Sequence, residues 1–482
     1  MNRAAFLILA FTPWLASCAL GPSVRPADTR LPVAYEAPAA PVGADADITR
    51  WWTLYNDPQL QTLVDQALAD APDALSARAR LQEALAVRAG ALAAFNPQGS
   101  IQGNGTRTDT YPIGQSATFN FGGETISLSP SGVTDSESVN FNVSWELDLF
   151  GRRAATRGKA NADLAAARFD YEASRTSLAA NVADQLFQAR GLAIQLDDAR
   201  ETARIEHQLQ DVARIKAEHG FGSGADAAQA EAEAAESDAQ AADLESQLHA
   251  ARRTLLILVG RGVDPLDSLP TPATAGAPPQ VPASVPGELM ARRPDVREAA
   301  AKLKSASGQL KLDELALFPK FTLQPGVGLT SGNSIGFPIT SDFWSIGLGV
   351  AQPVLDLPRQ KTEIRAQGAR ADQAAIAYQK TVQTAYGEAE NALVGLASDE
   401  TRIRLLTAAE AKARMAYDAA RQRYGAGLDD LSSVLSTERT WRSARTALTG
   451  AQVEALRRSV QAFKALGGGW TPSAAPISRG AR

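Results

Sequence analysis

The chain has 482 residues, of which 21% are charged and only 6% are aromatic, and its formal net charge is −5. This acidic balance argues against nucleic acid as a partner. One cysteine and three separated histidines exclude a disulfide framework and show no metal-ligand spacing. Long alanine-rich stretches favour thin helix-to-helix packing over a large compact core.

The N-terminus predicts an export signal over residues 1–17. Arg3 supplies the positive charge, and an apolar run over residues 4–15 follows it. The run ends in Leu-Ala-Ser-Cys18, which is similar to a bacterial lipobox and implies cleavage before Cys18 and its lipidation, palmitate included. An ordinary signal peptide with an incidental cysteine stays open. Ala19 stands where an inner-membrane retention signal would place Asp, which favours the outer membrane, and residues 18–50 should form a lipid-anchored, extended leader.

Helical periodicity begins near Trp51-Trp52 and continues to Phe95, where Asn96-Pro97 stops it. From residue 98 to 150 the pattern changes to a period of two, with apolar and polar residues alternating at both ends of the segment. A Gly/Ser/Thr-rich loop, about residues 110–135, separates two expected strands of roughly ten residues.

The same alternation returns over residues 320–356, so each half of the chain should contain one β-hairpin. Strands of this length, apolar on one face and polar on the other, are typical of an outer-membrane wall. A soluble hairpin half-packed on a domain is the alternative. Four strands cannot close a sheet in lipid, so the membrane interpretation requires other chains to complete it.

One helix is expected from Arg152 to His219, and a second from Arg359 to about Ala426. Each carries a coiled-coil seam of small and apolar residues. Glycines interrupt both helices at a cost of roughly 1 kcal/mol each relative to alanine, and close helix approach would explain them. The seam positions are Val182, Leu186, Ala189, Ala193 and Leu196, then Ala389, Leu393, Leu396, Glu400 and Ile403; the glycines are Gly191, Gly387 and Gly395.

The two halves are a tandem repeat, because matched residues recur at matched spacings. Pro72-Asp73 corresponds to Pro294-Asp295, and Glu231 and Glu438 each follow a glycine by 11 residues. Shorter helices over residues 60–95, 225–259, 288–316 and 430–465 should flank the long ones. The expected division is a first repeat over 51–259, a proline-rich linker over 260–287, a second repeat over 288–466 and a flexible tail over 467–482.

Helix-to-helix turns are expected at Gly220-x-x-Ser223-x-x-Asp226 and at Gly427-x-x-Asp430-x-x-Ser433. Glycine permits the left-handed conformation that ends a helix, and Ser or Asp can cap the next one. Capping alone could be the whole role of these residues.

The assembled motifs resemble the TolC family of outer-membrane efflux proteins, and its lipoprotein branch (the OprM/NodT type) in particular. They cover nearly the whole mature chain. The matching segments are Cys18-Ala-Leu-Gly-Pro22, Trp51-Trp52-x-x-Tyr55-x-Asp57-Pro58-x-Leu60, Trp145-Glu-Leu-Asp-Leu-Phe-Gly-Arg152, Arg292-Arg-Pro-Asp-Val-Arg-Glu-Ala299 and Arg423-Tyr424-x-x-Gly427.

The resemblance implies a mostly α fold with membrane β: a tandem-repeat long-helix α-barrel plus a 12-stranded β-barrel shared by three chains, four strands per chain. It implies a homotrimer in the outer membrane that extends into the periplasm. The partners would be outer-membrane lipid, a periplasmic adaptor (membrane fusion) protein and an inner-membrane pump, commonly of the resistance-nodulation-division type. Drugs, toxic compounds or metal ions would leave through it unchanged, which would confer multidrug resistance.

The resemblance also implies that the two turns form the periplasmic tip and gate. Tyr424 fits a tyrosine that helps to hold the closed tip, and Arg439 fits a basic position one turn further along the chain. Family members often place an aspartate ring where this chain has Ser433 and Ser436, so Asp429 and Asp430 are the expected source of tip charge instead. Three copies of an acid around a threefold axis would attract cations.

Seven acids and no Lys or Arg lie between Gly220 and Ala251, which predicts either a solvated helix face or an acidic channel lining. No motif supports catalysis, a metal site or a cofactor; Gly220-Phe-Gly-Ser-Gly224 lies between helices, the wrong context for a nucleophile elbow. The prediction is therefore a passive exit duct. The alternatives are a non-conducting, envelope-bridging coiled-coil lipoprotein and a type I protein-secretion duct.

Overall fold

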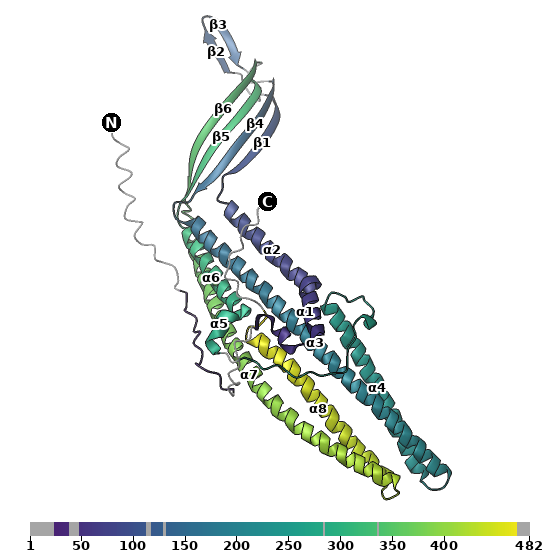
Figure 1. Cartoon of the computed structure of the whole chain (residues 1–482). Helices are drawn as coiled ribbons and strands as arrows, with labels where there is room; N and C mark the ends of the chain where they lie inside the picture. The colour runs from purple at the N-terminus through teal and green to yellow at the C-terminus, as the bar shows by residue number, and fades with distance from the viewer. Residues whose placement is uncertain are drawn as a thin grey trace. The chain divides into compact units, whose positions relative to one another are not determined.

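The computed structural model describes residues 24–37, 48–111, 117–128, 132–282, 285–334 and 337–469 (Figure 1). Cys18 and the signal segment lie outside these residues. The chain divides into two compact units, and each draws on both sequence repeats. Unit 1 comprises Met1–Pro26, Ala84–Leu164 and Lys302–Ala375, and unit 2 comprises Ala27–Glu83, Ala165–Ala301 and Ile376–Arg482.

Unit 1 contains a four-stranded antiparallel sheet in the order β1-β4-β5-β6. The two predicted hairpins are confirmed, and β4 and β5 join them side by side (Figure 1). The strands are longer than the predicted ten residues: β1 is Gln98–Thr110, β4 is Gly132–Leu147, β5 is Lys320–Ser334 and β6 is Phe337–Ala351.

Cross-strand pairing places the apolar residues of this sheet on one face. Phe141 lies opposite Val327, and Val327 lies opposite Trp344, so three strands contribute to one apolar row. Trp344 is 79% exposed within the chain. Asn140 and Gly328, one position away, lie on the other face. The period-two prediction is therefore confirmed, and the apolar face has no cover within the chain's described residues.

The predicted loop over residues 110–135 was partly wrong, because it contains a second, two-stranded sheet. β2 (Ala117–Phe121) pairs with β3 (Glu124–Leu128). Gly122 and Gly123 connect them with φ of 64° and 90°, the left-handed pair that a tight hairpin turn requires.

The long helices match the prediction. α3 is Arg152–Glu218 and α7 is Leu357–Gly425. α4 (Gly224–Leu258) follows α3, and α8 (Leu431–Ala465) follows α7. The first seam is buried along its length, whereas Glu400 in the second seam is exposed and Asp399 is buried in its place. No helix among the described residues is both long enough and apolar enough to cross a bilayer.

The predictions of single helices over 60–95 and 288–316 were wrong, because a proline breaks each of them at the same place in the repeat. Ala71 and Arg293 adopt extended backbone immediately before Pro72 and Pro294. The pieces are α1 (Pro58–Asp70) and α2 (Pro72–Ala93), then α5 (Leu289–Arg292) and α6 (Pro294–Leu315); Trp51-Trp52 lies in a 3₁₀ segment, η2 (Ile48–Tyr55).

The core of unit 2 is built on aromatic stacking. Trp51 is fully buried and stacks on Phe463 with ring centroids 5.7 Å apart and an interplanar angle of 9°. The linker contributes Leu269 and Val281 to this core. Two short 3₁₀ segments, η3 (Leu266–Ser268) and η4 (Pro286–Glu288), lie near them in the sequence. The predicted flexible tail was wrong for its first residues, since Gly469 is buried and donates its N–H to the Ile48 carbonyl at 2.9 Å.

The described part of the leader, residues 24–37, has neither helix nor strand and lies against α7. The Ala37 N–H donates to the Glu390 carboxylate at 2.6 Å, and Tyr35 stacks on Tyr386 with centroids 5.9 Å apart. The chain is thus fastened to a long helix after it leaves the N-terminal segment.

Close helix approach explains two of the three helical glycines. A Cβ on Gly191 would lie 2.6 Å from Val453 of α8, and one on Gly395 would lie 2.5 Å from the Arg458 side chain. The same explanation was wrong for Gly387, where a Cβ meets nothing within 4 Å in the chain.

Replacing Gly191 and Gly387 by alanine should therefore have opposite effects. Gly191→Ala forces a methyl group onto Val453 at about 1–3 kcal/mol, more than the roughly 1 kcal/mol that alanine contributes to a helix. Gly387→Ala should stabilise the protein by the roughly 1 kcal/mol that alanine contributes to a helix, because its methyl group meets nothing in the chain. Thermal unfolding of the purified variants measures the difference, and a stabilised Gly191→Ala would contradict the close approach.

Candidate functional site

The two hairpin turns of unit 2 have the same backbone construction. Gly220 and Gly427 adopt φ of 74° and 73°. The N–H of Phe221 bonds the Lys216 carbonyl at 2.8 Å, and the N–H of Leu428 bonds the Arg423 carbonyl at 2.9 Å. Each turn is therefore a Schellman ending that only glycine adopts without strain.

Different side chains cap the helices that leave these turns. Ser223 Oγ accepts the Ala225 N–H at 3.0 Å, and Asp430 Oδ1 accepts the Ser433 N–H at 2.8 Å. Asp226 is exposed in the first turn of α4, where its charge favours the helix N-terminus. The predicted capping geometry is confirmed for Ser223 and Asp430.

Of the remaining predicted tip residues, Tyr424 and Asp429 make side-chain contacts. Tyr424 lies under the Lys216 ammonium, 3.9 Å from the ring centroid, and packs against a small apolar cluster of α3, α4 and α8. Asp429 forms an ion pair with Arg423 at 3.4 Å and accepts the Ser433 hydroxyl at 3.3 Å. Ser436 is exposed.

Arginines on α8 connect it to the other hairpin, and we call this set the arginine ladder. Three of them recur at intervals of three residues, which keeps them near one face of the helix. Each is paired with an acid on α3 or α4, so charge pairs hold the α7–α8 hairpin to the α3–α4 hairpin. The pairs are Arg439–Glu233, Arg442–Glu206, Arg445–Asp198 and Arg457–Asp184.

Aromatic contacts hold α7 to α8 within their own hairpin. Tyr417 is buried and stacks on Trp441 with centroids 5.2 Å apart, and the Trp441 indole donates to Glu410 at 2.8 Å. Burial raises the pKa of Tyr417, so the phenol stays neutral.

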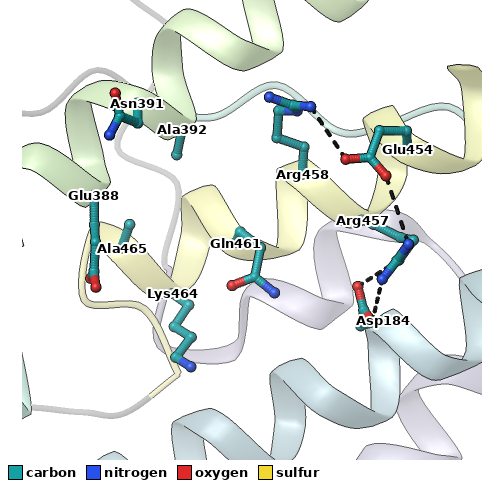
Figure 2. A pocket seen from close by; sticks show the side chains of 10 residues that line it. All are labelled: Asp184, Glu388, Asn391, Ala392, Glu454, Arg457, Arg458, Gln461, Lys464 and Ala465. Carbon is teal, nitrogen blue, oxygen red and sulfur yellow. Dashed lines mark hydrogen bonds and ion pairs between the residues drawn. The ribbon is translucent and has the colours of Figure 1, made fainter.

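A cavity of about 590 Å³ lies further along α8, and its wall is charged (Figure 2). Arg457 pairs with Asp184 at 2.9 Å, and Arg458 pairs with Asp399 at 2.7 Å. Basic and acidic groups balance around the cavity, and its lining residues include no nucleophile beside a base. The cavity therefore offers a neutralised, polar surface without a catalytic arrangement.

The Arg-Arg-Pro-Asp segment has a structural role at the edge of this cavity. Arg293, only 9% exposed, pairs with Asp295 at 2.6 Å and with Glu388 at 2.7 Å. It also donates to the Ala465 carbonyl at 3.0 Å. This arginine thus ties the break before α6 to α7 and to the end of α8.

Sequence reasoning found Arg439 but missed the rest of the arginine ladder. The spacing of Arg439, Arg442 and Arg445 in the helix after the second turn could have indicated it. Glu206 gave no such signal, because nothing nearby in the sequence shows that it is fully buried. Of the seven acids after Gly220, only Glu233 is drawn into the ladder; the other six are exposed within the chain.

The family of outer membrane efflux proteins matches residues 63–261 and 285–468, which leaves the proline-rich linker between the two matched parts. This chain therefore belongs to the outer membrane efflux protein family. Its members are transport proteins rather than enzymes, and the chain is an outer-membrane channel of an efflux system that extends into the periplasm. The predicted family, fold class and channel function are confirmed.

Individual relatives agree along nearly the whole length. The chain is 29% identical over 473 residues to the pyoverdine export outer membrane protein OpmQ of Pseudomonas aeruginosa, covering 96% of this chain and 97% of that protein. It is 27% identical over 482 residues to the toluene efflux pump outer membrane protein TtgC of Pseudomonas putida, covering 97% and 96%. Relatives of this kind are components of efflux pumps, so pump partners are implied here as well.

Solved structures show the same fold. The outer-membrane channel OprN superposes with a TM-score of 0.79 at 26% identity, covering 94% of this chain and 100% of that one. The Campylobacter jejuni CmeC outer membrane channel gives a TM-score of 0.83 at 22% identity, covering 95% and 96%.

Removing the Asp430 cap should fray the start of α8. Asp430→Ala leaves the Ser433 N–H without its side-chain acceptor and costs about 1 kcal/mol. Amide hydrogen exchange over residues 431–435 should quicken by about fivefold. Ser436→Ala, at an exposed position, is the control, and equal exchange in both variants would show that the cap is dispensable.

Proposed function

We propose that this channel is the exit duct of a tripartite efflux assembly and that three copies of the chain form it. The main observation behind this proposal is that the sheet has two unpaired edge strands. Among the described strands, β1 and β6 each pair with one neighbour only, while the sheet exposes an apolar face. An unpaired edge in hydrocarbon costs several kcal/mol for each unsatisfied group. Pairing β1 of one copy with β6 of the next removes both edges.

The helices of unit 2 would then continue the duct through the periplasm. We place the tip and gate at the two turns, with Tyr424, Gly427, Asp429, Asp430 and Arg439 on one hairpin and Gly220, Ser223 and Asp226 on the other. Tyr424 supports this placement, because it contacts Lys216 of the opposite hairpin. Ser433 and Ser436 follow on α8.

The remaining parts follow from the sequence predictions. Cys18 would carry the lipid anchor after removal of residues 1–17, and residues 18–50 would lead from it to the first repeat, 51–259. The linker 260–287, the second repeat 288–466 and the C-terminal segment 467–482 complete the chain. A periplasmic adaptor and a pump of the resistance-nodulation-division type would be its protein partners, with outer-membrane lipid around the strands.

The cargo would be a small compound released unchanged, such as a drug, a toxic organic molecule or a metal ion. Relatives named for pyoverdine export and for toluene efflux favour this class over secreted protein.

Purified protein in planar bilayers tests the three-chain duct. The expected result is unitary current from an assembly of three chains, counted by analytical ultracentrifugation in detergent. A stable trimer without current would contradict the duct, and a monomer would overturn the shared-sheet argument. Mild crosslinking in cells should recover an adaptor and a pump.

Weakening the arginine ladder should open the channel. Arg445→Ala removes the pair with Asp198, and partly exposed pairs of this kind contribute up to about 1 kcal/mol. The open fraction in bilayer recordings should therefore rise by up to about fivefold.

Arg214→Ala is the matched control, because Arg214 pairs only with Asp211 and Glu218 of its own helix among the described ion pairs. It should leave the open fraction unchanged. An equal open fraction in the two variants would show that the arginine ladder has no part in the gate.

A further inference from the structure

Two glutamates from opposite hairpins meet in the middle of the arginine ladder. Glu206 of α3 and Glu438 of α8 are both 0% exposed, and their four carboxyl oxygens have no hydrogen-bond partner among the described residues. Arg442 is the nearest cation, with Nε 2.9 Å from Glu438 Oε2 and Nη2 3.6 Å from Glu206 Oε1. One guanidinium therefore lies beside two buried carboxyl groups.

The charges around this pair do not balance without such a proton. Glu233 of α4 also faces the pair, but Arg439 forms an ion pair with it. Among the ion pairs of the described residues, Glu206 and Glu438 are then left with the guanidinium of Arg442. Tyr417 of α7 also faces Glu206 and Glu438, with Arg421 beside it, and the Tyr417 phenol is neutral.

Full ionisation would therefore leave one buried negative charge without a counterion. That arrangement costs several kcal/mol, and a buried group protonates in preference to it. A single proton held by the pair neutralises the excess charge.

We propose that Glu206 and Glu438 bind one shared proton, and that this proton fastens the α7–α8 hairpin to α3. This assignment deepens the proposed function, since it rests on the hairpins forming the gate. Release of the proton leaves two carboxylates facing each other, and their repulsion loosens the contact between the hairpins. The site is thus a latch that acid closes and alkali releases.

The direction of the pKa changes agrees with this latch. Burial raises the pKa of Glu438 from 4.5 to about 8; Arg442 opposes the rise, and the neighbouring Glu206 adds to it. Burial also raises the pKa of Glu206. Because the folded pair holds its proton more tightly than the unfolded chain, its stabilisation is complete below about pH 4.5 and is lost as the pH rises through about 8.

The repeat supplies a matched control for this site. Glu231 occupies the position in the first repeat that Glu438 occupies in the second, 11 residues after the turn glycine in each case. Glu231 is exposed on α4, whereas Glu438 is fully buried. Glu231→Gln therefore removes an equivalent carboxyl group without touching the latch.

Infrared spectroscopy of the purified full-length protein tests the shared proton directly. Between about pH 6 and about pH 10, which bracket the pKa of Glu438, the wild type should lose the C=O stretch of about one protonated carboxyl group per chain. Glu438→Gln should abolish this loss, and Glu231→Gln should retain it. A wild type with no titrating carboxyl band, or a Glu438→Gln variant that keeps it, would overturn the proposal.

Hydrogen exchange tests whether the proton fastens the hairpins. After correction for the intrinsic rate, exchange around Glu206 and Glu438 should quicken by about tenfold or more over the same pH interval. Glu206→Gln and Glu438→Gln, which keep the shape of the side chain, should flatten this change. Unchanged exchange in the wild type would refute the latch.

Bilayer recordings separate this proposal from the proposed function. The open fraction of the wild type should rise with pH, and that of Glu438→Gln should not. Absence of current from every variant would count against the duct, whereas the infrared and exchange results decide the latch independently of conduction.

Discussion

Charge pairing along α8 joins the two helical hairpins over the stretch between the apolar core of unit 2 and the tip. Within each hairpin, the apolar contacts include those of Leu192 and Leu196 of α3 with Leu244 of α4, and the stacking of Tyr417 on Trp441 between α7 and α8. Between the hairpins, the arginine ladder acts together with the apolar core of unit 2, which contains Leu186 of α3 and Val460 of α8, and with a small apolar cluster at the tip. Since ion pairs are weakened by salt and by titration, this is the contact that solution conditions can change.

The two repeats share the backbone geometry of their breaks and turns, but differ in the side chains at matching positions. The proline breaks before α2 and α6 and the two Schellman turns are the same in both repeats. The caps differ, with Ser223 in one repeat and Asp430 in the other, and so do the glutamates that follow. The two repeats thus share their backbone geometry, while the side chains of α8 join the second repeat to the first.

Most of the fold could be predicted because its signals are local: period two in the strands, heptad-like seams in the long helices, and glycine at the turns. Pro72 was visible in the sequence, but the apolar stripe continues through it and obscured the break. Gly122-Gly123 likewise marks a hairpin inside a segment whose polar composition indicates a loop. The Glu206–Glu438 pair could not be predicted, because 232 residues separate its members and burial arises only when α3 and α8 meet.

A ladder of charges suits a moving contact better than an apolar seam would. Separating apolar helices exposes surface at roughly 25 cal/mol per Å², so a hairpin held by leucines would resist opening in proportion to its length. Separating ion pairs returns each charge to water, which recovers much of the lost attraction as hydration. The buried group of Glu206, Glu438 and Arg442 differs from these pairs, because water does not reach its two carboxyl groups while the hairpins are in contact. In the proposed gate, the contact between the hairpins therefore combines several partly exposed pairs of small individual strength with one buried group, at which the proposed proton acts.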